Sequence, residues 1–473
     1  MGLIPSHKRP QEDTIMPGIR VENPATGEVL ETFEHITEQE ALAAVDTAHE
    51  AFLSWRETPI EERAKIVTRV GELFEERKDE LDDIIATEMG KPVSEGVEEA
   101  EFCGAIFSYY AGNGPKFAAD EEIPVEMDGT AYIQRRPFGV LLGIMPWNFP
   151  YYQVARFAAP NLMLGNTIIL KHAEICPRSA LAIQKIMDDA GVPKGVYTNV
   201  FVTHDQVEKI IEHKELRGVS LTGSERAGAA VGAIAAKNLK KAVLELGGSD
   251  PYIILDTPDV KQAAKDAWET RLYNTGQACN SNKRLIVMED IYDEFVAELV
   301  ELAKAMKPGK PEDASETVYT PLSSRGAAEK LKQQLDDAVA AGATLHVGGE
   351  LVDDKSSYLS PAVLTDVPVG SDVYYEELFG PVATVFKVSS DEEALTLAND
   401  TQYGLGGCVF SQDVERAKKI GQKLEVGMSN VNTYAAEGAE VPFGGVKNSG
   451  YGRELGPYGM DEFVNKCTYF VAN

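Results

Sequence analysis

Apolar positions in the first hundred residues of the chain recur at the spacing of amphipathic helices. Helices are predicted over 37–55, 59–90 and 94–112. The first of them begins with Thr37 and Glu40 in the arrangement of a capping box. Residues 121–137 instead alternate between apolar and polar, which is typical of an antiparallel hairpin, and Asp128-Gly129 supplies a turn.

From residue 139 onward, short apolar runs alternate with helical segments. The first series of runs is GVLLGIMP, NTIILK, YTNVFV, GVSLTG and AVLELGG. A second series begins at PYIILD, near residue 249, and includes RLIVM, ATLHVGG, PVATVFKV and GGCVFS. Buried strands separated by helices pair in parallel, so the fold class is α/β with two doubly wound units. The C-terminal CTYFVAN is predicted as an edge strand, which invites pairing with another subunit.

Length and charge narrow the class of protein. A chain of 473 residues is too long for one ordinary core, so two large domains are expected. The net charge of −30 repels a polyanion, which excludes nucleic acid as a partner. No apolar run reaches the roughly 18 residues of a membrane span, and the N-terminus lacks the profile of a secretory signal.

The cysteines and histidines narrow it further. Five cysteines, odd in number and without a CxxC pair, indicate reduced thiols and a cytoplasmic location. The seven histidines show no grouping of the HxxxH or HxH kind, so no metal site is expected.

Three side chains are candidates for chemistry. Cys279 lies in YNTGQACNSNKR (273–284), where it is either a core thiol beside a glycine or a nucleophile on a loop. Glu245 ends the apolar run in LELGGSD, where burial of an unused carboxylate would be costly. Asn148 in PWNFP either satisfies a turn or donates into a cleft. A nucleophile, a base and an oxyanion donor are the parts that covalent acyl chemistry needs.

Gly223 and Ser224 in LTGSERAG follow a predicted strand and precede a predicted helix. A pyrophosphate could bind at such a helix N-terminus, and a glycine that only makes a tight bend is an equally good interpretation.

The chain resembles the aldehyde dehydrogenase superfamily from about residue 20 to its end. The resemblance rests on PWNFP, GNTIILKHAE, LTGSERAG, ELGGSDP, NTGQACNSNKR, EELFGPV and PFGGVKNSGYGRE, in the order and spacing of the family. Glu245 and Cys279 lie 34 positions apart, counted from 245 to 279, as the base and nucleophile of that family do. Within the superfamily, the motifs are most like bacterial enzymes that oxidise succinic semialdehyde.

The resemblance implies a fold and a set of roles. Residues 1–118 and 138–248 would form a Rossmann-variant NAD(P)-binding domain, 249–448 a catalytic domain, and 119–137 with 449–473 an oligomerisation element. Cys279 would be the nucleophile, Glu245 the base and Asn148 an oxyanion donor. Cofactor contacts would come from Trp147, Lys171, Glu174, Gly223, Ser224, Glu377 and Phe379.

The substrate residues follow from the same resemblance. Arg156 and Arg271 match arginines that hold the distal carboxylate of the substrate at the entrance above Cys279, although Arg156 could also be a surface arginine in an ion pair. Tyr273 stands where some relatives carry arginine or glutamine, and it would either contribute its hydroxyl or narrow the site for an aromatic aldehyde. Ser281 replaces a cysteine that forms a redox lock in some relatives.

Cofactor and assembly are predicted as well. Glu174 would repel a 2′-phosphate, so NAD is favoured over NADP, with His172 adding positive charge only below its reference pKa of about 6.5. A homodimer or homotetramer is expected. Two other reactions are possible: oxidation of another aliphatic or aromatic aldehyde, and acyl transfer to coenzyme A. The presence of Glu245 argues against acyl transfer to coenzyme A. A third alternative is a binding protein without catalytic activity.

Overall fold

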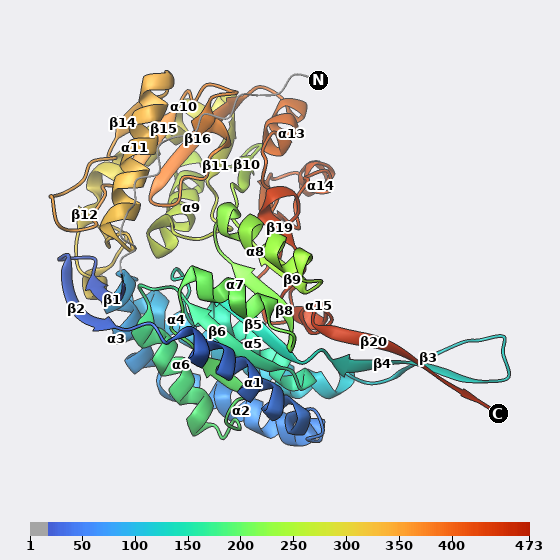
Figure 1. The fold of residues 1–473 in the computed structure, drawn as a ribbon. Coiled ribbons are helices and arrows are strands. Elements are labelled where there is room, and N and C mark those ends of the chain that lie inside the picture. The colour runs from blue at the N-terminus through green and yellow to red at the C-terminus, as the bar shows by residue number, and fades with distance from the viewer. Residues whose placement is uncertain (1–17) are drawn as a thin grey trace, which may run out of the picture.

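The structure of the chain is a computed structural model that describes residues 18–473. The N-terminal segment, where no secretory signal is expected, lies outside the described residues, as does the start of the predicted cofactor domain. Two α/β units and a projecting three-stranded arm make up the described part (Figure 1). None of the helices between residues 18 and 473 has both the length and the apolar character to cross a membrane.

The first unit is built on a six-stranded sheet in the order β19-β9-β8-β5-β6-β7. Its strands are β5 (Val140–Met145), β6 (Thr167–His172), β7 (Tyr197–Asn199), β8 (Leu216–Thr222), β9 (Lys241–Glu245) and β19 (Gly450–Tyr451). All neighbours are parallel except β19, which is antiparallel to β9. The helices between these strands are α5 (Tyr152–Leu164), α6 (Pro177–Asp189), α7 (His204–Glu212) and α8 (Glu225–Lys237). The predicted α/β class is confirmed.

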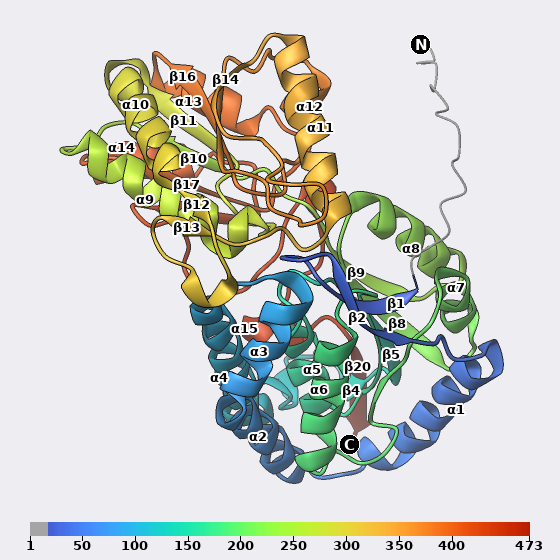
Figure 2. The ribbon, with the colours of Figure 1, turned by 90° about the vertical axis from the view of Figure 1, so that its left-hand side faces the viewer.

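Helices from the N-terminal part of the chain pack around this sheet (Figure 2). They are α1 (Glu38–Trp55), α2 (Ile60–Glu76), α3 (Lys78–Met89) and α4 (Val93–Phe117), preceded by the hairpin β1 (Ile19–Asn23) and β2 (Glu28–Phe33). The capping box of Thr37 and Glu40 is present with both of its bonds. The single helix predicted over 59–90 is wrong: it is divided at Arg77, whose φ of −111° and ψ of 13° lie outside helical geometry.

The second unit holds a seven-stranded sheet in the order β14-β15-β16-β11-β10-β17-β18. Its strands are β10 (Pro251–Ile254), β11 (Arg284–Met288), β14 (Thr344–Val347), β15 (Ala362–Thr365), β16 (Val382–Val388), β17 (Gly406–Phe410) and β18 (Met428–Val431). The accompanying helices are α9 (Val260–Leu272), α10 (Glu289–Ala305), α11 (Arg325–Ala341), α12 (Asp372–Tyr375), α13 (Asp391–Asn399) and α14 (Val414–Gly421), and the short strands β12 (Lys307–Pro308) and β13 (Val318–Tyr319) pair beside them. Only β14 runs against its neighbour.

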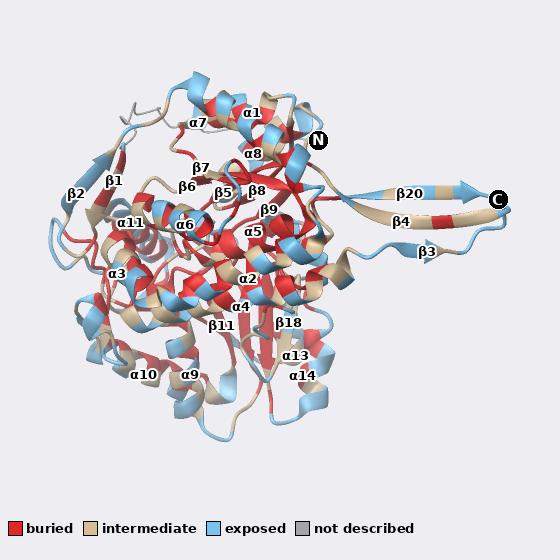
Figure 3. Cartoon of the chain, turned by 90° about the horizontal axis from the view of Figure 1, so that it is seen from below, coloured by how far each residue is buried: buried red, intermediate tan, exposed pale blue. Residues whose placement is uncertain are grey.

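A three-stranded arm projects from the first unit, and nearly all of its residues are exposed or only partly buried (Figure 3). It consists of β3 (Glu121–Ile123), β4 (Gly129–Pro137) and β20 (Val464–Ala472) in the order β20-β4-β3. β20 is an edge strand, as predicted. The predicted arm segment 449–473 begins too early, because β19 pairs with β9 in the first sheet and α15 (Gly456–Met460) packs against α5.

Candidate active site

The loop that carries the candidate nucleophile follows α9 and begins with a left-handed turn. Asn274, Thr275 and Gly276 have φ angles of 50°, 52° and 75°. Left-handed backbone is disfavoured for residues with a side chain, and most of all for β-branched ones, so contacts must hold it. The Asn274 N–H donates to Glu95 Oε2 at 2.7 Å, and the hydroxyls of Thr275 and Thr320 lie 2.7 Å apart. The turn is therefore fixed by one contact from each unit.

Arg271 lies beneath this turn and does not line a cavity. Its five N–H groups donate to the carbonyl oxygens of Val382, Gly276, Leu378 and Gly380 and to the hydroxyl of Ser281. Burial lowers the pKa of Arg271 to about 10, which still leaves the guanidinium charged at neutral pH. The prediction that Arg271 binds a substrate carboxylate is wrong, because all five donors of its side chain are already used.

Cys279 opens onto a cavity of about 600 Å³ that is lined by both units. Aromatic rings form much of the wall, among them Phe149, Tyr152 and Tyr273. Tyr273 is 39% exposed, and its ring stacks on Phe149 with 6.0 Å between centroids. Between residues 18 and 473, no lysine or arginine contributes to the wall. The cavity wall therefore combines aromatic surface and neutral polar groups with four acidic side chains, those of Glu98, Glu99, Asp250 and Glu437.

The thiol of Cys279 is balanced between opposing charges. Burial raises the pKa of Cys279 to about 11, while Arg156 and Lys283 lower it and Glu377 and Glu245 raise it. The neutral thiol therefore predominates at neutral pH, and the nucleophilic thiolate becomes more abundant as pH rises.

Asn148 follows β5 and joins the PWNFP loop to the nucleophile loop. The side-chain N–H of Asn148 donates to the backbone carbonyl of Gln277 at 3.0 Å, and the backbone carbonyl of Asn148 accepts from Asn274 Nδ2 at 2.8 Å. An amide group has two N–H donors, so the second remains for another acceptor. Glu99 fixes the other end of this loop, since Glu99 Oε1 accepts the N–H groups of Tyr151 and Tyr152 at 2.8 and 3.0 Å.

Glu245 is the last residue of β9, is only 2% exposed and lies opposite Gly450 of β19. Neither of its carboxyl oxygens has a hydrogen-bond partner within residues 18–473. Burial raises the pKa of Glu245 well above its ordinary value, the charge of Arg156 opposes this shift, and Glu454 adds to it. A buried carboxyl group with free oxygens suits a base that takes a proton from water.

Arg156 is fully buried on α5 and forms an ion pair with Glu454. One of its N–H groups also donates to Thr222 Oγ1 at 3.2 Å. Its guanidinium lies over the rings of Tyr152 and Phe443, at 5.1 and 4.5 Å from their centroids, and both rings line the cavity. The prediction that Arg156 lines the cavity entrance is wrong, as is the surface ion pair considered beside it: the arginine lies one layer behind the wall.

The residues expected at the cofactor lie around the ends of β5, β6 and β8 and in the 377–379 loop. Lys171 Nζ and Glu174 Oε1 form an ion pair at 2.6 Å. Gly223 follows β8, and Ser224 caps α8 by accepting the N–H of Ala227 at 3.3 Å. The N–H groups of that helix end suit a pyrophosphate, and Glu174 suits ribose hydroxyls, so the side chains fit a dinucleotide.

Two aromatic residues expected at the cofactor contact each other: the rings of Trp147 and Phe379 meet edge to face, with 5.8 Å between centroids.

His172 has a lower pKa than was expected. Burial lowers the pKa of His172 to about 4, Nε2 donates to the Pro150 carbonyl at 2.9 Å, and Nδ1 accepts the Ala173 N–H. His172 therefore gains positive charge only near pH 4, well below the expected value of about 6.5.

Three residues of the site have no role in the sequence-based prediction. Lys283 and Glu454 lie inside the motifs NTGQACNSNKR and PFGGVKNSGYGRE, and their place in these motifs was the sequence feature that could have indicated a role in the site. Glu99 gives no signal, because an acidic residue on an amphipathic helix is ordinarily a solvated one. Within the described residues, no three His, Cys, Asp or Glu side chains gather as ligands for a metal ion.

A thiol, Cys279, lies at a cavity lined by both α/β units, and the Glu245 carboxyl group and the Asn148 amide lie near its loop. These groups define a class of enzymes that work through a covalent acyl intermediate. A model of the aldehyde dehydrogenase family matches residues 11–468. The chain belongs to this family, and it is an NAD(P)-dependent aldehyde dehydrogenase.

Individual proteins that are similar to this chain are also aldehyde dehydrogenases. A succinate-semialdehyde dehydrogenase (NADP(+)) of Deinococcus radiodurans is 49% identical over 444 residues, which cover 94% of this chain and 93% of that protein. The crystal structure of a succinic semialdehyde dehydrogenase from Streptococcus pyogenes in complex with NADP+ matches with a TM-score of 0.93 and 41% identity, over 96% of this chain and all of that one. A betaine aldehyde dehydrogenase from Staphylococcus aureus in complex with NAD+ matches with a TM-score of 0.92 and 32% identity, over 96% and 91% of the two chains.

Proposed function

We propose that the protein oxidises succinic semialdehyde to succinate, with NAD+ as its preferred cofactor. The observation that supports the proposal is the Cys279 loop, which the Asn148 amide bonds at Gln277 and whose thiol feels the charge of Glu245. The chain that carries it is 49% identical, over nearly its full length, to a protein named for this reaction. The first unit would bind the cofactor and the second would supply the nucleophile.

The side chains support a two-stage reaction. The Cys279 thiol first gives its proton to solvent, and the thiolate Sγ then bonds to the aldehyde carbon as the C=O π pair moves to oxygen. The Asn148 amide and the Cys279 N–H stabilise the resulting oxyanion. NAD(P)+, which Glu174, Ser224 and Glu377 would hold, would supply the hydride acceptor, and loss of hydride from the adduct would leave a thioester on Cys279. Glu245 then takes a proton from water, the water oxygen attacks the thioester carbon, and the acid leaves as the thiol re-forms. A base placed for water favours hydrolysis over acyl transfer to coenzyme A.

We expect neutral donors to recognise the substrate carboxylate, because all donors of Arg271 are used and Arg156 pairs with Glu454 outside the cavity wall. Tyr152, Gln153 and Asn280 line the cavity and carry such donors. Hydrogen bonds to a charged group contribute about 1.5–3 kcal/mol. We therefore expect kcat/KM for succinic semialdehyde to exceed that for butanal by roughly 10- to 200-fold, measured as NAD(P)H formation with and without coenzyme A. A preference for benzaldehyde would favour the aromatic wall as the specificity element and contradict the proposed substrate.

An Arg156→Ala variant is the matched control for this comparison. Because Arg156 pairs with Glu454 behind the wall, its loss should lower activity on succinic semialdehyde and on butanal by similar factors. A loss confined to succinic semialdehyde would show that the guanidinium reaches the substrate after all.

NAD+ is expected to be used better than NADP+, although the relatives above include enzymes named for NADP+. Burial tends to raise the pKa of Glu174, but its ion pair with Lys171 lowers it below the ordinary value, so the carboxylate is charged at neutral pH. Its charge would repel a 2′-phosphate, and kcat/KM should favour NAD+ by about tenfold or more. Glu174→Gln should bring the kcat/KM values for NAD+ and NADP+ closer together. A higher kcat/KM for NADP+ in the parent enzyme would contradict the proposed preference for NAD+.

The arm is proposed to join subunits into a homodimer or homotetramer. Its sheet has β20 and β3 as unpaired edges, and β20 exposes Tyr469 and Val471. Exposed strand edges with apolar side chains are typical of surfaces that pair with another chain.

A further inference from the structure

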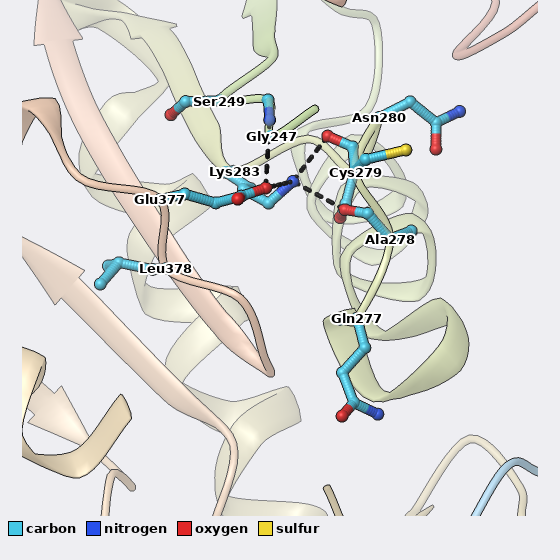
Figure 4. Close-up of polar contacts among 12 residues, drawn as sticks. Gly247, Ser249, Gln277, Ala278, Cys279, Asn280, Lys283, Glu377 and Leu378 are labelled. Carbon is cyan, nitrogen blue, oxygen red and sulfur yellow. Dashed lines mark hydrogen bonds and ion pairs between the residues drawn. The ribbon is translucent and has the colours of Figure 1, made fainter. Parts of the chain in front are cut away.

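Lys283 is a buried cation at the end of the nucleophile loop, four residues after Cys279 (Figure 4). Its side chain is 1% exposed, and its ammonium contacts three oxygens. Nζ donates to the carbonyl of Ala278 at 2.6 Å and to that of Cys279 at 2.8 Å, and it lies 3.0 Å from Glu377 Oε1. An ammonium group has three donors, so all three are used.

The contact to Ala278 fixes the peptide that contains the Cys279 N–H. The carbonyl of Ala278 and the N–H of Cys279 belong to one planar trans peptide, in which the two groups point in opposite directions. Holding the oxygen against Lys283 therefore turns the N–H away from Lys283. The Cys279 sulfur also extends from the side of the loop opposite the Lys283 contacts (Figure 4). A cation on the carbonyl additionally polarises the peptide and makes its N–H a stronger donor.

Two glycines allow these segments to meet. A Cβ on Gly248 would collide with the Cys279 carbonyl oxygen, and one on Gly247 would lie 2.6 Å from Glu377 Oε2. The Gly248 N–H donates to Glu377 Oε1 at 3.1 Å, on the oxygen that Lys283 also contacts. The segment after β9 and the nucleophile loop are thus joined through the ion pair of Lys283 and Glu377.

We propose that Lys283 is a positioning residue that orients and polarises the Ala278–Cys279 peptide, so that its N–H faces the reacting carbonyl and stabilises the oxyanion. The proposal deepens the proposed function and rests on Cys279 as the nucleophile, but not on the identity of the aldehyde. Lys283 also ties this peptide to Glu377, so the oxyanion donor and the cofactor carboxylate share one anchor.

Two reactions of the thiol separate this role from a general effect of charge. Acylation by p-nitrophenyl acetate passes through an oxyanion, whereas alkylation by iodoacetamide needs the thiolate but forms no oxyanion. Charges facing the sulfur are those of Arg156, Lys283, Glu377 and Glu245, and they affect both reactions alike. Cys467 is the only other thiol that is not buried, so both rates are measured without cofactor in a Cys467→Ala background.

Lys283→Met in that background should slow acylation by about 100-fold, which is the loss of one oxyanion donor, and slow alkylation by no more than about tenfold. Equal losses in both reactions would overturn the proposal, because only the thiolate would then depend on Lys283. No loss in either would reduce Lys283 to a partner of Glu377.

A second variant guards against unfolding caused by an unpaired Glu377. Lys283→Met with Glu377→Gln removes both charges and should show the same excess loss of acylation over alkylation. If the parent shows no acylation that depends on Cys279, both the nucleophile and this proposal fail. If it shows such acylation but does not oxidise succinic semialdehyde, only the proposed substrate fails.

Discussion

Replacing Cys279 with alanine should lower aldehyde oxidation by about 10⁴-fold or more, because hydride leaves only from the covalent adduct on sulfur. The cavity wall and the cofactor side chains would remain, since Cys279 makes no side-chain hydrogen bond in the described structure. NAD(P)H formation measures the loss, and a binding titration with NAD+ should show nearly unchanged affinity.

Cys467→Ala is the matched control. Cys467 is also a free, partly exposed thiol, but it lies on β20 in the arm, away from the cavity. This variant should keep the activity of the parent. Substantial turnover by Cys279→Ala would show that another group attacks the aldehyde.

Glu245→Gln should separate the two stages of the reaction. The thioester would still form, and its hydrolysis would slow by about 10²- to 10⁴-fold without a base for water. A rapid burst of NAD(P)H close to one equivalent per site, followed by a slow steady rate, is the expected trace. Stopped-flow absorbance measures both phases.

The pH dependence gives a second measure of the same residue. Burial holds the pKa of Glu245 well above its ordinary value, so the base is protonated at low pH and its ionised fraction grows as pH rises. Steady-state turnover of the parent should increase with pH through that ionisation, and the glutamine variant should lose this part of the profile. Loss of the burst together with the steady rate would instead indicate that Glu245 activates the thiol.

Local patterns predicted the elements well because their causes are local. The capping box at Thr37 and the alternation of buried strands with helices depend on neighbours within a few residues, and both are present. The break at Arg77 was not predictable in this way, because residues 75–80, EERKDE, contain no glycine or proline that would mark it.

The two arginines show where reading a site from matched positions fails. Position along the chain predicted their presence near Cys279, but their direction depends on distant partners. Arg156 turns to Glu454, and Arg271 turns to carbonyl groups more than 100 positions away. Desolvation likewise neutralises His172, which no pattern in the sequence indicates. Lys283 lay within a quoted motif, but its use could be inferred only from the oxygens around it.

The last strand of the first sheet has a consequence for how the enzyme matures. Glu245 is covered by β19 and by Gly444, and the partner of Arg156 is Glu454, so the surroundings of the base come from the final thirty or so residues of the chain. During synthesis on the ribosome, the central strands of both sheets emerge long before these residues. A nascent chain would therefore fold most of its framework while Glu245 remains open to solvent, and we expect the new enzyme to become active only when its C-terminal segment has docked.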